Sequence, residues 1–291
     1  MRTLRSLRED LHLLVKYHLK HPVETHPARE EALGLVELPF DLEAYVAKLE
    51  ALGGERFAVR REAELAFDGR PHPMLTLRSR APARATLLVI AGIHGNERAS
   101  LLAVPEILER FEAGRGVRLV VISPANPVGA SQLSRYNARG YDINRDFKRF
   151  ETEEARVIRA VFERERPDFV VSLHEGPQDA TFMFANEHVP SEVARRGLQA
   201  IAAGGATLAV RDYFGLPLDP PGLSASTRVS RVANRVWAAV PGMMATIQYS
   251  AERSIPELVL ESSWRERDAS TRIRPHVDLV DAVSRAISDQ P

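Results

Sequence analysis

The chain has 291 residues, of which 44% are hydrophobic and 27% charged, and its 39 basic residues balance 39 acidic ones. These are the proportions of a folded globular protein, and zero net charge removes the electrostatic basis for non-specific binding to nucleic acids or membranes. Because the sequence contains no cysteine, disulfides and thiolate metal sites are excluded, and a transition metal must be held by histidine and carboxylate groups.

The first part of the sequence predicts helices. Leucines at helical spacing indicate an amphipathic helix over residues 3–20, which two prolines in 21–27 end. Asp41 is placed to cap a second helix that Gly53 and Gly54 would end. We find no signal-peptide pattern and no apolar run near the ~20 residues that cross a bilayer, so we expect a cytoplasmic protein.

From residue 56 onward the pattern predicts strands that alternate with helices. Alternating residues predict two strands, 56–67 and 73–80, and near-continuous apolar runs predict buried strands at 85–93, 117–123 and 168–174. We expect helices at about 97–112, 151–166, 190–203, 226–239 and 268–288, and strands at about 243–249 and 256–261. This order indicates an α/β fold with a mixed, mainly parallel twisted sheet and helices on both faces.

Metal-binding residue types follow two of the buried strands. His94 and Glu97 lie in a glycine-containing loop after the strand at 85–93, and His174 ends the strand at 168–174. The carboxyl ends of parallel strands meet at one edge of a sheet, where ligands bind. Two imidazoles and one carboxylate, with a fourth position open to water, form a known catalytic zinc set. We therefore expect one Zn²⁺ per chain at these three residues.

A further polar stretch lies between the two metal motifs. It contains Arg135, Asn144 and Arg145, and the last two are flanked by the apolar Ile143 and Phe147. A guanidinium anchored between apolar neighbours can bind a carboxylate through two parallel hydrogen bonds. This stretch therefore predicts a binding site for a carboxylate.

The order of these motifs resembles that of the zinc carboxypeptidase (M14-type) metallopeptidases. HxxE at 94–97, NPxG at 126–129, RxNxxGxDxNRxF at 135–147 and a strand-end histidine follow one another as in that family. The resemblance covers roughly residues 55–265 and is greatest to the bacterial and cytosolic branch, which includes murein tripeptide amidases. It implies a zinc-carboxypeptidase-like domain over 55–291, preceded by a helical N-terminal extension, 1–54.

The resemblance also implies roles for the polar stretch. Arg135 would polarise the carbonyl at the cleaved bond, and Asn144 with Arg145 would hold the substrate's terminal carboxylate. The family's asparagine after this pair is replaced by Asp146, which we expect to place a negative charge beside Arg145. In the family a mobile tyrosine closes over the substrate, and Tyr249 and Tyr213 are the candidates here.

The family's general base is a glutamate at the end of a late core strand, and Glu261 matches that placement. Glu257 at the start of this strand and Glu252 before it are expected to be solvated. Glu175 is the competing candidate because it adjoins His174, but side chains alternate along a strand, so it should point away from the metal.

Together these features predict a zinc-dependent metallocarboxypeptidase or amidase that hydrolyses an amide bond next to a free carboxylate in a small peptide. The alternative is an N-acyl-amino-acid deacylase of the related succinylglutamate desuccinylase/aspartoacylase group. A third possibility is an inactive binding module that retains the pocket. None of these classes involves nucleic acid or a membrane.

Overall fold

The computed structural model describes residues 34–213, 215–239 and 242–289, so the helix expected at 3–20 lies outside the described residues. The helix expected after Asp41 is confirmed as α2 (Leu42–Ala51). The Asp41 carboxylate accepts a hydrogen bond from the Ala44 amide at 2.7 Å, which satisfies one of the amides left free at a helix start. On its inner face α2 buries Tyr45 and Leu49 in the main hydrophobic core.

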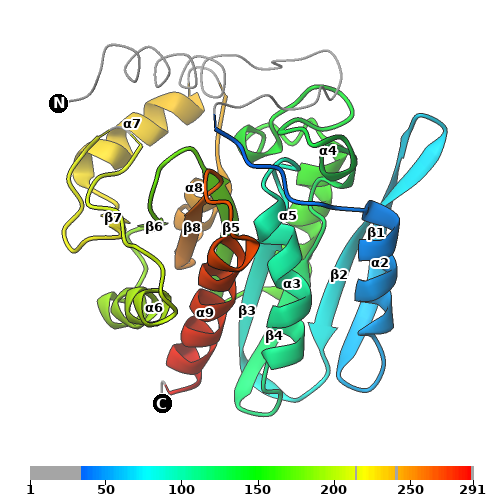
Figure 1. Ribbon diagram of the computed structural model, residues 1–291, viewed down its shortest axis with the longest axis horizontal. Coiled ribbons are helices and arrows are strands. Elements are labelled where there is room, and N and C mark those ends of the chain that lie inside the picture. Colours follow the sequence, from blue (N-terminus) through cyan, green and yellow to red (C-terminus); the bar gives the residue numbers. More distant parts are fainter. Residues whose placement is uncertain (1–33, 214, 240–241, 290–291) are drawn as a thin grey trace.

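The described residues form an eight-stranded sheet in the order β1-β2-β4-β3-β5-β8-β6-β7 (Figure 1). The four strands β4, β3, β5 and β8 are mutually parallel, β1 and β2 form an antiparallel hairpin at one side, and β6 runs antiparallel to β8. The expected mixed, mainly parallel centre is therefore confirmed. The strands are β1 (Phe57–Phe67), β2 (Arg70–Ser79), β3 (Ala83–Ala91), β4 (Gly116–Ile122), β5 (Phe169–Gly176), β6 (Phe182–Ala185), β7 (Leu223–Ala225) and β8 (Glu257–Ser263).

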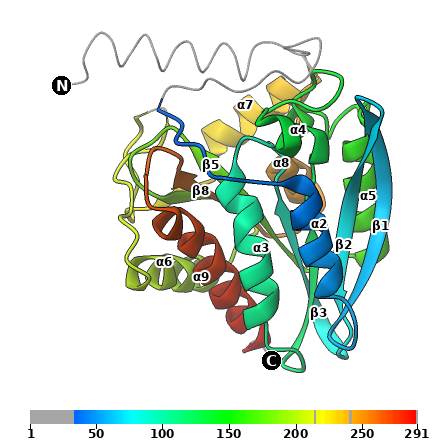
Figure 2. The ribbon, with the colours of Figure 1, turned by 45° about the vertical axis from the view of Figure 1, so that its right-hand side comes forward.

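Helices cover both faces of this sheet (Figures 1 and 2). One core joins α2, α3 (Arg98–Arg110), α6 (Ser191–Ala203) and α9 (Ala269–Ser288) to one face. A second core joins α5 (Glu153–Glu165) and α8 (Thr246–Ala251) to the other. Alternation along β3 feeds both cores, since Leu87 and Val89 enter the first and Leu88 and Ile90 the second. In the part of the chain that the structure describes, the other helices are the short α4 (Pro127–Gln132), the 3₁₀ turn η2 (Ile143–Arg145) and α7 (Arg228–Ala239).

The strand expected at 243–249 is wrong, because this segment contains an irregular stretch followed by α8. Its apolar and β-branched residues favour a strand locally, but its backbone groups find other partners. The Gln248 side chain accepts from the Ala245 amide at 3.2 Å, and the Thr246 amide donates to the side chain of Asn144 at 3.0 Å. These contacts begin a helix, and the second comes from a residue about a hundred positions away, which no local pattern contains.

The topology brings the chemically interesting segments to one edge of the sheet. Strands β3, β5 and β8 are neighbours, and all three run in the same direction. The loop after β3, the last residues of β5 and those of β8 therefore meet at the same edge. Among the described residues, no helix combines the length and apolar character that a bilayer span requires.

Candidate active site

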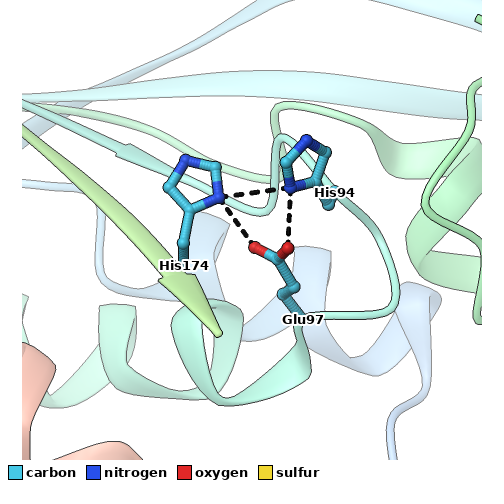
Figure 3. Close-up of side chains that lie close together, drawn as sticks. All are labelled: His94, Glu97 and His174. Carbon is cyan, nitrogen blue, oxygen red and sulfur yellow. Dashed lines mark hydrogen bonds and ion pairs between the residues drawn. The ribbon is translucent and has the colours of Figure 1, made fainter. Parts of the chain in front are cut away.

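Three side chains converge at this edge, as the sequence predicts: His94, Glu97 and His174 (Figure 3). The Nδ1 atom of His94 lies 2.7 Å from one carboxylate oxygen of Glu97, and the Nδ1 atom of His174 lies 2.8 Å from the other. The two Nδ1 atoms are 3.2 Å apart. All three residues are buried, and their ligand atoms lie within 4.8 Å of one another, so one ion could contact all of them.

Two glycines let the loop after β3 deliver His94 and Glu97 to this point. Gly92 has a φ of +73°, and a side chain there would place its Cβ 2.2 Å from Leu101. A Cβ on Gly95 would lie 1.9 Å from the carbonyl carbon of Gly129. Any larger residue at either position would therefore displace the loop that carries the first two ligands.

Asp142 orients the first histidine, a role the sequence analysis did not assign. Its Oδ1 lies 3.2 Å from Nε2 of His94, while the Arg135 guanidinium donates to its Oδ2 from Nε at 3.0 Å and from Nη2 at 2.8 Å. Burial alone would raise the pKa of Asp142, but the charges of Arg135 and His94 hold it well below its usual range. A carboxylate on the far nitrogen of a histidine fixes the ring so that the other nitrogen can bind a metal.

The donor set fits a metal such as zinc. Two imidazole nitrogens and a carboxylate point at one another, and the fourth direction has no protein ligand within the described cluster. Burial lowers the pKa of His174, which favours the neutral imidazole that metal binding requires. The cluster therefore meets three requirements of a catalytic metal site. Its residue types are ones that bind metals, their ligand atoms converge on one point, and the Asp142 carboxylate orients His94.

Arg135 reaches the same cluster from the segment after α4. Its Nη1 atom lies 3.2 Å from Nδ1 of His94 and 3.6 Å from Oε1 of Glu97. The side chain is buried and is held in place by Asp142. A fixed positive charge therefore stands next to the three metal-type ligands, where it could stabilise negative charge that develops on a carbonyl oxygen.

Asn144 and Arg145 lie in the 3₁₀ turn that follows Asp142. The Asp142 carboxylate accepts from the Asn144 amide at 3.0 Å, and Nη1 of Arg145 donates to the carbonyl of Asn144 at 2.9 Å. Arg145 is half-buried, and burial lowers its pKa while the charge of Asp142 opposes the shift. The turn thus holds both residues beside the metal cluster, because one carboxylate, that of Asp142, contacts His94, Arg135 and the turn itself.

The expectation that Asp146 places its charge against Arg145 is corrected by the structure. The Asp146 carboxylate accepts from the backbone amides of Glu151 and Thr152, at 3.1 and 2.7 Å, and from the Thr152 hydroxyl at 2.7 Å. It therefore holds the start of α5. The physical reason is that a short carboxylate side chain bonds readily to backbone amides a few residues ahead.

Glu261 lies beside the metal-type ligands on the neighbouring strand. It is in register with His174 across the parallel pair β5–β8, so the two side chains share a face of the sheet. Burial and then the charge of Glu97 raise the pKa of Glu261 well above its usual value, and a hydrogen bond from Tyr213 opposes this. A Cβ on Gly176 would lie 2.4 Å from the Tyr213 hydroxyl, so this glycine leaves the space that the tyrosine occupies.

Glu175 points to the opposite face of the sheet, as the alternation along β5 predicts. Its carboxylate accepts from Nε and Nη2 of Arg272 at 2.7 and 3.0 Å, and from the backbone amide of Ala99 at 2.8 Å. Both members of this ion pair are buried. Glu175 is therefore engaged in the core between α3 and α9.

The expectation that Glu257 is solvated is wrong, whereas Glu252 is exposed as expected. Glu257 is fully buried, and its carboxylate accepts from the hydroxyls of Ser172 and Thr246, each at 2.8 Å, and from that of Ser250. The sequence places Glu257 at a strand start, where exposure is common, but α8 folds over this end of the strand and covers it.

The structure does not bring Tyr249 to the candidate site. Its ring packs against Phe147, Phe150 and Phe162, with centroids 5.4–5.7 Å apart, and the guanidinium of Arg253 lies 3.4 Å from its centre. The residue is buried in the core between α5 and α8. The reason is the helical course of 246–251, which turns this side chain inward.

Tyr213 is the tyrosine that the structure places by Glu261, and Asp142 is the carboxylate that sequence reasoning left without a role. For Asp142 a signal existed, since it is the only acid inside the motif between Arg135 and Asn144. For Tyr213 no local pattern distinguishes it, because its neighbours come from the ends of β5 and β8.

Comparison with known proteins agrees with this geometry. The model of the succinylglutamate desuccinylase/aspartoacylase catalytic domain matches residues 83–230. "Probable carboxypeptidase 2" of Arthroderma benhamiae is 30% identical over 105 residues, a match that spans 31% of this chain and only 19% of the fungal protein.

Solved structures share the fold at low sequence identity. A metallo-carboxypeptidase from Burkholderia cenocepacia is 16% identical, with a TM-score of 0.62 over 86% of this chain and 70% of that one. The metallo-carboxypeptidase from Pseudomonas aeruginosa, solved in complex with (2-guanidinoethylmercapto)succinic acid, is 21% identical, with a TM-score of 0.54 over 84% of this chain and 69% of that one.

The family match spans just over half of the chain and includes, among other residues described above, the three metal-type ligands and the two arginines assigned to the site. These are His94, Glu97, Arg135, Arg145 and His174. Glu261 lies beyond it, on β8 of the same sheet. The chain has the fold of solved metallo-carboxypeptidases and a buried His-Glu-His cluster, and by this match it belongs to the succinylglutamate desuccinylase/aspartoacylase catalytic-domain family.

Proposed function

We propose that this protein is a zinc-dependent hydrolase that cleaves an amide bond whose nitrogen belongs to a residue with a free carboxylate, in a small peptide. The observation that carries the proposal is the position of Glu261, which is in register with His174 on the neighbouring strand and near enough to Glu97 for the two charges to interact. A carboxylate of raised pKa next to a metal site is the arrangement that general-base hydrolysis needs.

Each residue of the candidate site has its own role in the proposed hydrolysis. Asn144 and Arg145 bind the substrate carboxylate, which fixes the neighbouring carbonyl relative to the metal ligands. Arg135, held by Asp142, stabilises negative charge on the carbonyl oxygen. A zinc ion held by His94, Glu97 and His174 would supply Lewis acidity and make water more acidic. Glu261 accepts the proton of the attacking water and later delivers it to the leaving amine.

The family match favours a second candidate, an N-acyl-amino-acid deacylase. The two reactions share the bond type and the free carboxylate and differ only in whether the acyl side is a peptide or a short acyl group. An inactive binding module is disfavoured, since the three ligand residues, Arg135 and Glu261 are all present and are brought together.

A paired substrate panel tests this proposal. Zinc-loaded protein is assayed on dipeptides and on N-acyl-amino acids, each as the free acid and as the C-terminal amide. We expect the free acids to be preferred, and we expect Arg145→Lys to weaken their binding by about 2–5 kcal/mol, because an ammonium cannot make two parallel hydrogen bonds. Equal turnover of acid and amide forms would overturn the proposal, and the better acyl class decides between the two candidates.

The metal assignment has a separate test that needs no substrate. His94→Ala or His174→Ala should abolish stoichiometric zinc binding while the far-UV circular dichroism spectrum is retained, because the cores of the two faces do not depend on the ligands. His188→Ala is the control, since this histidine contacts a backbone carbonyl elsewhere in the fold. Full zinc content in either ligand variant, measured by elemental analysis, would reject the assignment.

A further inference from the structure

A buried carboxylate lies on the same face of the sheet as the metal cluster but deeper in the protein. Glu257, the first residue of β8, is four positions before Glu261 and therefore shares its face. Its carboxylate accepts hydrogen bonds from three hydroxyls, those of Ser172 on β5 and of Thr246 and Ser250 on α8. Glu257 thus fastens α8 to the sheet through both oxygens.

The contact with Thr246 continues to Asn144, at the proposed carboxylate site. The backbone amide of Thr246 donates to Oδ1 of Asn144 at 3.0 Å. Only the oxygen of a side-chain amide can accept from an N–H group, so this bond fixes which way the Asn144 amide is turned. Its Nδ2 group, which can donate to a ligand carboxylate, is consequently directed away from Thr246.

Two further hydrogen bonds tie the segment before α8 to the turn that carries Asn144 and Arg145. The Met244 amide donates to the carbonyl of Arg145 at 3.0 Å, and the Phe147 amide donates to the carbonyl of Met244 at 3.1 Å. The segment 244–246 therefore supports the turn along its length. Any displacement of α8 relative to the sheet is passed to both residues of the proposed carboxylate site.

Packing alone gives no reason for an acid at this position. No basic side chain pairs with Glu257 among the described residues, and burying a carboxylate without a cation is costly even when hydroxyls surround it. An apolar residue of similar size would satisfy a purely structural need at lower cost. The carboxylate instead fixes the position of Thr246 through a hydrogen bond, which an apolar side chain could not make.

We propose that Glu257 is a positioning residue for substrate recognition: through Thr246 it sets the orientation of the Asn144 amide, and with it the affinity for the substrate's free carboxylate. This inference rests on the proposed function, because it assigns a support to the carboxylate site named there. Glu257 acts through Thr246 and touches neither substrate nor metal.

The test combines two matched pairs of variants with two substrates. Glu257→Leu removes the acceptor, and Glu257→Gln keeps one acceptor oxygen. Thr246→Val removes the hydroxyl that Glu257 binds, and Thr246→Ser keeps it. Each zinc-loaded protein is assayed on the best free-acid substrate from the panel and on its C-terminal amide, with zinc content and thermal unfolding recorded.

For Glu257→Leu and Thr246→Val we expect KM for the free acid to rise about tenfold, the lower end of the cost of a lost hydrogen bond to a charged group. We expect kcat to stay within about twofold and the amide substrate to be unaffected. Glu257→Gln and Thr246→Ser should retain most of the preference for the acid. If Glu257→Leu fails to fold, the Thr246 pair decides alone.

Equal losses on acid and amide substrates, or an unchanged preference in both disruptive variants, would overturn the inference and leave Glu257 with a structural role only. Failure of the proposed function is recognised separately, in the wild-type protein, as the absence of any preference for the acid. The two failures therefore appear in different proteins of the same experiment.

Discussion

The two faces of the sheet at the ends of β5 and β8 carry the same residue types in different roles. On the face of α5 and α8, His174 and Glu261 stand side by side at a cluster of metal-type ligands. On the face of α3 and α9, the adjacent Glu175 is closed off in a buried ion pair with Arg272. The adjacent residues His174 and Glu175 therefore differ in role, the first lying in the candidate site and the second in the core, because successive side chains of a strand point to opposite faces.

The largest effect should come from exchanging the two acids for their amides. Glu261→Gln keeps the size and polarity of the side chain but cannot accept a proton, so turnover should fall about 10²–10⁴-fold while zinc stays bound. Glu175→Gln should retain most activity per bound zinc, because its carboxylate lies on the opposite face. The measurement is kcat with zinc content for both proteins. An inactive Glu175 variant beside a working Glu261 variant would reverse the roles of the two faces.

The buried ion pair allows a stability prediction for the other face. Glu175→Ala leaves the Arg272 guanidinium buried without its carboxylate, and the free energy of unfolding should fall by about 3–5 kcal/mol. Replacing both partners, as Glu175→Leu with Arg272→Met, should recover much of this loss, since no uncompensated charge remains. Urea unfolding of the three proteins checks the prediction. A double variant no more stable than Glu175→Ala would show that the pair contributes more than charge compensation.

The smallest effect concerns Glu257 and pH. Burial raises its pKa from 4.5 to about 7, so between these values the folded protein binds more protons at this group than the unfolded chain does. The free energy of unfolding should therefore decrease as pH rises through this window, by roughly 3 kcal/mol from this group.

The side chain of Glu257→Gln does not titrate, so its free energy of unfolding does not contain this pH-dependent contribution. The free energy of unfolding of the variant minus that of the wild type should therefore rise by roughly 3 kcal/mol between about pH 4 and pH 8. Thermal or urea unfolding of both proteins at several pH values measures this difference in the free energy of unfolding. The contributions of the other carboxylates cancel in the difference because both proteins contain them. A constant difference across the range would show that Glu257 keeps an ordinary pKa in the folded state.

The sequence anticipated the elements that depend on local patterns. The capped helix α2, the apolar strands β3, β4 and β5, and the late strand β8 that carries Glu261 all follow from spacing and capping signals. The convergence of His94, Glu97 and His174 was predictable as well, since parallel strands carry whatever follows them to one edge.

The segment 244–257 shows where such reasoning stops. Thr246 and Tyr249 lie in residues whose composition favours a strand, yet the segment becomes a helix because its first amide bonds to Asn144. The burial of Glu257 and the inward turn of Tyr249 both follow from that helix. None of these outcomes is encoded within a window of neighbouring residues.

The sequence by itself determined the residue types of the metal cluster, their order along the chain and the side of each strand to which they point, because these depend on chain direction and on the two-residue period of a strand. Only the tertiary structure decided which groups support them. Asp142 behind His94, Tyr213 beside Glu261 and Glu257 beside Ser172 are paired across long stretches of sequence. Such pairings depend on how helices pack over the sheet, and many packings are compatible with one local pattern.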